Sequence, residues 1–191
     1  MASGRPIRIE QMETFPKQTY RNRCEIMTVS GKFSLVVPVS RPHGNHTLTA
    51  DMQISFREPW QRNHWRAIQT AYNSSPYFTF YAEKIQHLIF GQETLLIKFN
   101  HQIIKGINEL LKIGPDIGYT DDYMKSDTTH ADFRTLISPK HPVPGIDYPA
   151  YPQVFSHIHG FIPGLSILDL LFNLGPEAKK YIEGLRLKTE D

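Results

Sequence analysis

The stretch RNHWRAIQTAYNSSPYF, residues 62–78, marks the point where the sequence pattern changes from strands to helices. Its apolar residues Trp65, Ile68 and Tyr72 are spaced three and four positions apart, which places them on one face of an α-helix. The sequence Asn-Ser-Ser-Pro at 73–76 then ends this helix and precedes a second one. We therefore predict a helix that packs on the core through this face.

The residues before this stretch alternate between apolar and polar types, as strands with one buried face do. Residues 6–10 predict a short edge strand, and residues 52–56 predict another strand. Between them, residues 18–39 predict a hairpin that turns at Ser30 and Gly31. The first third of the chain is thus expected to form strands.

The residues after position 76 are mainly helical in pattern. Residues 96–110 form the longest helical stretch, with a continuous apolar stripe that Gly114 and Pro115 end. The other predicted elements are a helix over 76–90, a strand over 116–120, a short helix over 133–137, a strand over 151–155, an apolar helix over 165–172 and a last helix from Pro176. Strands on both sides of a helical block predict a single α/β domain over residues 1–191, a mixed β-sheet flanked by helices, with an α+β arrangement as the alternative.

The segment LSILDLLF, residues 165–172, is apolar on nearly all sides, which predicts a buried helix. A buried carboxylate without a partner is costly, so we expect Asp169 to be hydrogen-bonded. The segment is also too short to span a membrane, and we predict no transmembrane segment.

The composition argues against several classes of protein. A hydrophobic fraction of 40% in 191 residues is typical of a globular domain. With 21 Lys and Arg against 19 Asp and Glu, the charge is too even to indicate nucleic-acid binding. The lone cysteine, Cys24, cannot form an internal disulfide and is interpreted as a small buried hydrophobe, and the N-terminus lacks the apolar run of a secretion signal. These features predict a cytoplasmic protein.

Common catalytic and cofactor motifs are absent from the sequence. It contains no glycine-rich nucleotide loop, no serine-hydrolase elbow and no HExxH zinc motif, and we predict no cofactor. If residues 154–161 were extended, His157 and His159 would face the same side and could form one arm of a zinc site. No third ligand stands at a suitable spacing, so no metal is predicted.

Polar residues around the hairpin and the first helix suggest an anion site. Arg21 and Arg23 share one strand face, and guanidinium groups suit phosphate or carboxylate, although each arginine could instead face water. His64 is either a packing residue or a general acid or base. As ligands of an anionic substrate or donor we predict Lys17, Arg21, Arg23, Arg62, Asn73 and Ser74, with His64 catalytic and with Arg21, Arg23, Arg62 and His64 lining one cleft.

Five long segments, in order, resemble the WbqC-like protein family of bacteria. They are KQTYRNRC (17–24), GKFSLVVPV (31–39), RNHWRAIQTAYNSSPYF (62–78), DFRTLISPK (132–140) and YPQVFSHIHGFIPGLSILDLLFNLGPE (151–177). The resemblance extends from about residue 9 to residue 180. Family members generally begin with another strand and a turn into a helix, where this chain has MASGRP, so we expect that N-terminal element to be missing.

The resemblance implies a biological context, because the family takes its name from a protein encoded among O-antigen genes. It implies an intracellular role in making or decorating surface polysaccharide, including lipopolysaccharide. The leading hypothesis is a transferase-type enzyme that uses a nucleotide-sugar or an acyl or aminoacyl donor. The alternative is a non-catalytic binding or scaffolding partner of polysaccharide-biosynthesis enzymes.

Overall fold

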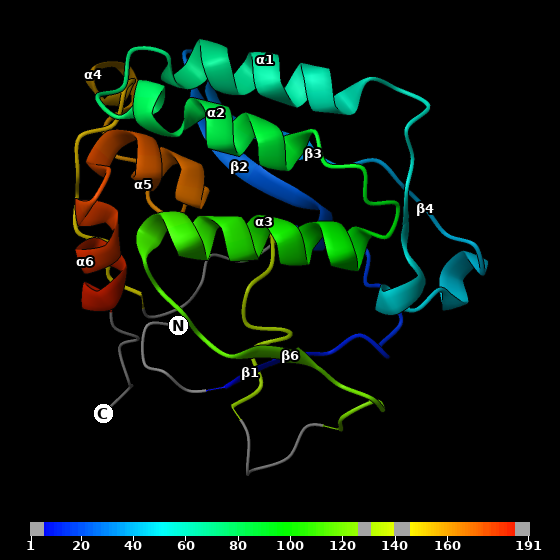
Figure 1. Cartoon of the computed structure of the whole chain (residues 1–191). Helices are drawn as coiled ribbons and strands as arrows, with labels where there is room; N and C mark the ends of the chain where they lie inside the picture. Colours follow the sequence, from blue (N-terminus) through cyan, green and yellow to red (C-terminus); the bar gives the residue numbers. More distant parts are fainter. Residues whose placement is uncertain (1–5, 126–130, 140–145, 186–191) are drawn as a thin grey trace.

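The computed structural model describes residues 6–125, 131–139 and 146–185. Its helices α1 (Trp60–Tyr72), α2 (Phe78–Ile89) and α3 (Leu96–Leu111) lie in a layer, with a β-hairpin behind α1 and α2 (Figure 1). The shorter helices α4 (Ser156–His159), α5 (Ile167–Leu174) and α6 (Glu177–Gly184) lie together at one end of this layer. Within the described ranges, no helix is both long and apolar enough to cross a membrane.

The strands pair both in parallel and antiparallel fashion, which confirms the predicted α/β class. The pairs are β1 (Ile7–Ile9) with β6 (Ile117–Tyr119) in parallel, and two antiparallel pairs, β2 (Arg23–Thr28) with β3 (Gly31–Val36) and β4 (Val39–Ser40) with β5 (Gln53–Ile54). Across the described residues these are separate two-stranded sheets instead of one continuous sheet. Pro38 contributes to the division, because it separates β3 from β4 and has no N–H to donate to a ladder. Three short 3-10 helices, η1 (Tyr20–Asn22), η2 (Gly44–His46) and η3 (Thr49–Asp51), connect the strands.

Two predicted elements are absent from the structure. Residues 133–137 form turns, because the Asp132 carboxylate accepts the backbone N–H of Arg134 (3.0 Å) and holds the chain in a bend. Residues 151–155 are not a strand, and the side chain of Gln153 pairs there with the backbone of Ile162 through two hydrogen bonds of 2.9 Å. In both places hydrogen bonds from a side chain to the backbone take the place of the backbone hydrogen bonds of a regular helix or strand.

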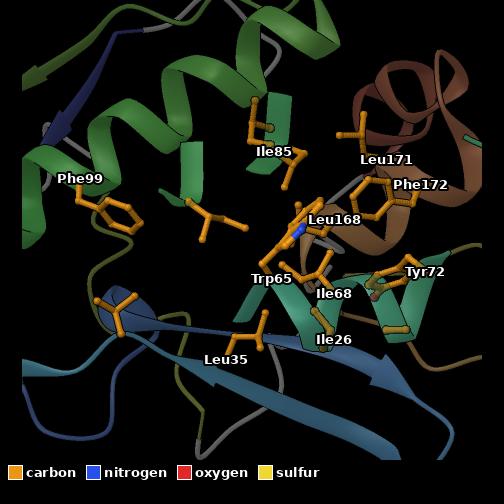
Figure 2. Close-up of a cluster of buried hydrophobic side chains, with 14 of the residues drawn as sticks. Ile26, Leu35, Trp65, Ile68, Tyr72, Ile85, Phe99, Leu168, Leu171 and Phe172 are labelled. Atoms are coloured by element: carbon orange, nitrogen blue, oxygen red, sulfur yellow. The ribbon is translucent and has the colours of Figure 1, made fainter. Parts of the chain in front are cut away.

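The predicted core face of α1 is buried. Trp65, Ile68 and Tyr72 are 8%, 1% and 0% exposed. The Tyr72 ring lies 5.2 Å from that of Phe172 on α5, and its hydroxyl accepts the backbone N–H of Met27 on β2 (3.3 Å). Figure 2 shows the side chains of the hairpin, α1, α2, α3 and α5 meeting around this face.

Helix α5 is the buried helix that the sequence predicts. Ser166 caps its first turn by accepting the backbone N–H of Leu168 (3.3 Å), and Leu170 is 6% exposed. The Oδ2 atom of the fully buried Asp169 accepts hydrogen bonds from the Tyr151 hydroxyl (2.6 Å) and from Gln153 Nε2 (3.0 Å). The expected hydrogen bonding of Asp169 is therefore confirmed.

Replacing Leu170 with alanine tests the contribution of this helix to the core. We expect Leu170→Ala to lower the free energy of unfolding by about 2–5 kcal/mol, because it leaves a cavity in a packed interior. Urea denaturation measures the change, with Thr70→Ala on the exposed face of α1 as the control. A loss below about 0.5 kcal/mol, as at surface sites, would contradict the placement of α5 in the core.

The ionisation of Asp169 should make the free energy of unfolding depend on pH. Burial raises its pKa above the ordinary value of 3.8, so the folded chain holds the proton more tightly than the unfolded chain. The stabilisation is complete below the unfolded pKa and is lost as the pH rises through the folded pKa. Asp169→Asn cannot ionise, so its free energy of unfolding relative to the wild type should rise with pH.

Urea unfolding of both proteins between about pH 4 and pH 8 checks this dependence. Asp121→Asn, at an exposed position, is the control. A difference between Asp169→Asn and the wild type that stays constant over this range would show that the pKa of Asp169 is not raised.

Candidate functional site

A cavity of about 550 Å³ lies between the hairpin, α1, α2 and α3. Its walls are mostly aliphatic and aromatic, and Figure 2 labels five of the residues that line it: Leu35, Ile68, Ile85, Phe99 and Leu168. The volume falls in the range of small-molecule sites, which are largely apolar with a few polar groups that orient the ligand. This cavity is the candidate functional site.

Three polar side chains of the cavity, those of Arg23, His64 and Asn100, come from the first turns or first residue of β2, α1 and α3. Arg23 opens β2 and pairs in register with Val36, whose carbonyl oxygen lies 3.1 Å from His64 Nε2. Asn100 Nδ2 on α3 donates to the carbonyl oxygen of Arg21 (2.7 Å), which ties α3 to the start of the hairpin. The hairpin register and these two bonds place Arg21, Arg23 and His64 on the wall of one cavity.

The three arginines that line the cavity differ in their partners. Arg21 forms an ion pair with Glu13, and Arg134 forms one with Asp132. In the part of the chain that the structure describes, no ion pair or hydrogen bond engages the guanidinium of Arg23. Arg23 therefore contributes an uncompensated positive charge to the wall.

Glu10 closes the cavity on the side of β1 and β6. Its Oε1 accepts from the backbone N–H of Met12 (2.7 Å) and from Thr120 Oγ1 (3.0 Å), and its Oε2 accepts from the backbone N–H of Met124 (2.8 Å). Burial alone would raise the pKa of Glu10, but these hydrogen bonds and the charge of Arg134 lower it below 4.5. Glu10 is a fully engaged carboxylate that holds the wall together.

His64 is half-buried and has one nitrogen committed to the backbone. A carbonyl oxygen can only accept, so Nε2 carries the proton that bonds Val36, and Nδ1 of the neutral ring is unprotonated. Burial lowers the pKa of His64 below 6.5, although the bond to Val36 opposes that shift. His64 is consequently neutral at pH 7, with Nδ1 able to accept a proton.

Four of the residues predicted from the sequence lie outside this cavity. Lys17, Arg62, Asn73 and Ser74 are exposed and do not line it. Arg62 precedes His64 by two positions, and successive helical residues turn by about 100°, so the two side chains leave α1 on nearly opposite sides. Asn73 follows His64 by nine positions, roughly 13 Å along the axis.

The histidines considered for a metal lie elsewhere. His157 and His159 belong to α4, one helical turn, so the expectation of an extended arm is wrong and the two rings do not share a face. His159 Nε2 instead bonds the carbonyl oxygen of Val29 (2.9 Å). Over residues 6–125, 131–139 and 146–185, no three His, Cys, Asp or Glu residues are grouped so as to hold a metal ion.

Several residues of the cavity were not predicted from the sequence. Thr49, Trp60, Asn100 and Arg134 all line it. Asn100 lies next to Phe99 at the edge of the apolar stripe of α3, and this polar residue beside the stripe was the available signal. The others carry no signal, because only the tertiary structure brings them to the cavity.

A histidine NMR titration tests the state of His64. We expect its pKa to lie below 6.5, because burial disfavours the charged ring. By linkage, its contribution to stability is present above the unfolded pKa and is lost as the pH falls. His64→Gln assigns the resonance, and a pKa at or above 6.5 would contradict the expected lowering by burial.

Comparison with known proteins identifies the family of the chain. The chain is similar to a protein of Mycobacterium tuberculosis (strain ATCC 25618 / H37Rv) described as "Uncharacterized protein Rv1507c", with 26% identity over 197 residues that cover 90% of this chain and 85% of that protein. No solved structure matches the chain. A family model described as "WbqC-like protein family" matches residues 7–140 and 143–181, which include every wall of the cavity. Matched over most of its length, the chain belongs to the WbqC-like protein family.

Proposed function

We propose that this protein is a transferase of bacterial surface-polysaccharide biosynthesis that binds an activated acyl donor in the cavity. The observation that carries the proposal is the cavity itself, a mostly apolar space whose polar wall holds Arg23 and the neutral His64. The surface-polysaccharide context comes from the resemblance to the WbqC-like family. The acyl donor comes from the chemistry of the walls.

The walls favour an acyl donor over a nucleotide-sugar. A nucleotide-sugar brings a diphosphate and many hydroxyls, and each buried polar group needs a partner to offset its desolvation. Two of the three lining arginines are already paired with carboxylates, which leaves Arg23 to face one negative charge. An aliphatic chain instead gains about 25 cal/mol for each Å² of apolar surface that it buries.

The proposed reaction uses His64 as the base and Arg23 as the electrostatic partner. The acceptor hydroxyl or amine gives its proton to Nδ1 of His64 while its oxygen or nitrogen bonds to the acyl carbon. The bond from the acyl carbon to the leaving group then breaks, and the imidazolium returns the proton to that group. Arg23 stabilises the negative charge that develops on the acyl oxygen.

A donor panel tests this function. Acyl thioesters and nucleotide-sugars are each incubated with the protein and with amino-sugar or hydroxyl acceptors, and transfer is followed by mass spectrometry. We expect transfer from acyl thioesters, together with a raised melting temperature. A ligand at about 100 Kd adds roughly 2.7 kcal/mol to the free energy of unfolding.

Variants separate catalysis from binding in that assay. His64→Ala should retain donor binding while transfer falls by about 10²–10⁴-fold, since an acid or base acts mainly in the transition state. Arg66→Ala, exposed on α1 and outside the cavity, is the matched control. If donors of either class bind but no group is transferred, the non-catalytic binding partner replaces the transferase.

A further inference from the structure

Three buried polar atoms beside the cavity have no hydrogen-bond partner among the described residues. They are Arg23 Nε, Thr49 Oγ1 and Trp60 Nε1, and all three residues line the cavity. Thr49 and Trp60 are only 6% and 3% exposed. Because a buried polar group without a partner is destabilising, its presence on a cavity wall points to a ligand that satisfies it.

Trp60 and Arg23 belong to the part of the cavity wall that contains His64, which we call the polar end. Trp60 packs its ring 5.1 Å from that of His64, which in turn bonds the residue opposite Arg23 in the hairpin. The Trp60 ring also lies 5.6 Å from Phe99 on α3. Thr49 belongs to η3, which packs against α3. Trp60 and Arg23 are thus linked through His64 and Val36, and Thr49 lines the same cavity from η3.

The chemistry of the unpartnered atoms indicates which kind of ligand group they can bind. The guanidinium and indole N–H groups can only donate, and the threonine hydroxyl can also donate. The ligand must therefore present acceptor oxygens, and the uncompensated charge of Arg23 favours oxygens that carry or develop negative charge. An aminoacyl ammonium does not fit this donor set, and the wall carboxylate of Glu10 is engaged by its own partners.

The rest of the cavity favours a ligand with an apolar chain. Away from the polar end the walls are mostly apolar, although Glu10 and Arg134 also line the cavity, and three apolar lining residues, Ile104, Phe133 and Ile137, are 36%, 54% and 47% exposed. Exposed apolar side chains that continue a cavity wall to the surface let a chain run from the polar end toward solvent without losing apolar contact. Acetyl and other short groups would leave most of this surface uncovered.

We propose that the cavity binds a fatty-acyl group, with Arg23, Thr49 and Trp60 donating hydrogen bonds to the oxygen of its carboxyl or thioester end. The inference rests on the proposed function in using the same cavity as the donor site, and it names the donor's acyl group as a medium or long aliphatic chain. A free fatty acid and a fatty-acyl thioester share this chemistry.

Calorimetric titration of the full chain with matched probes tests the ligand class. Octanoate and decanoate should bind, and each added methylene should tighten binding about fourfold. Acetate lacks the chain, octan-1-ol lacks the charge, and octylammonium reverses the charge; each should bind at least about tenfold more weakly than octanoate. Equal binding of octylammonium and octanoate would overturn the proposal.

Thr49→Val provides the sharpest variant, because it removes the hydroxyl and nearly preserves the shape. It should raise the melting temperature of the ligand-free protein, since an unpartnered buried hydroxyl is lost, and should weaken decanoate binding about tenfold. Arg23→Gln should weaken binding at least tenfold, and Arg66→Gln should change nothing. A lower melting temperature for Thr49→Val with unchanged decanoate binding would show that the hydroxyl serves the fold and would overturn the proposal.

Decanoyl-N-acetylcysteamine, a decanoyl thioester, separates this inference from the proposed function. Decanoate and thioester binding that depends on Arg23 and Thr49, without acyl transfer, supports the fatty-acyl site and rejects the transferase. Acyl transfer from acetyl or aminoacyl thioesters, with no binding of decanoate or its thioester, rejects the fatty-acyl site and leaves the transferase standing.

Discussion

The packing of one face of α1 supports the rest of the structure. Tyr72 joins three elements at once, because it belongs to α1, its hydroxyl accepts the N–H of Met27 on β2, and its ring packs on Phe172 of α5. With Trp65 and Ile68 on the same buried face, this contact fixes how the hairpin and α5 sit against the helical layer. The positions of His64 and Trp60 follow from it, because a helix fixed along one face is fixed on every other face.

The candidate site is a direct consequence of that placement and of the hairpin register. A shift of one residue in the β2–β3 pairing would turn Arg23 to the other face and remove Val36 from His64. The site is thus built largely on regular elements held by packing, which gives it a fixed geometry.

Local patterns explain most of what could be predicted from the sequence. The helical period predicted α1, α2, α3 and α5, and alternation around Ser30 and Gly31 predicted the hairpin. The helix predicted over 133–137 and the strand predicted over 151–155 were wrong. There the side chains of Asp132 and Gln153 form hydrogen bonds with the backbone in place of regular secondary structure. In the site, Arg21, Arg23 and His64 were predicted from their residue types, but the expected shared strand face was wrong, because Arg21 lies in η1 and β2 begins only at Arg23. Thr49 and Trp60 depend on long-range packing that no local pattern encodes.

The pairing of β1 with β6 has a consequence for the order of folding. It joins Ile7 to Ile117 across most of the chain through a ladder of only three residues, so it pays a large loop-closure entropy for few bonds. The β2–β3 ladder and the contacts of α2 with α1 and α3 are much closer in sequence and can form before it. Because Ile9 and Glu10 line the cavity, we expect this wall of the cavity to be completed late in folding. A ligand that contacts this wall would therefore favour the paired state of β1 and β6, because it binds only the folded cavity.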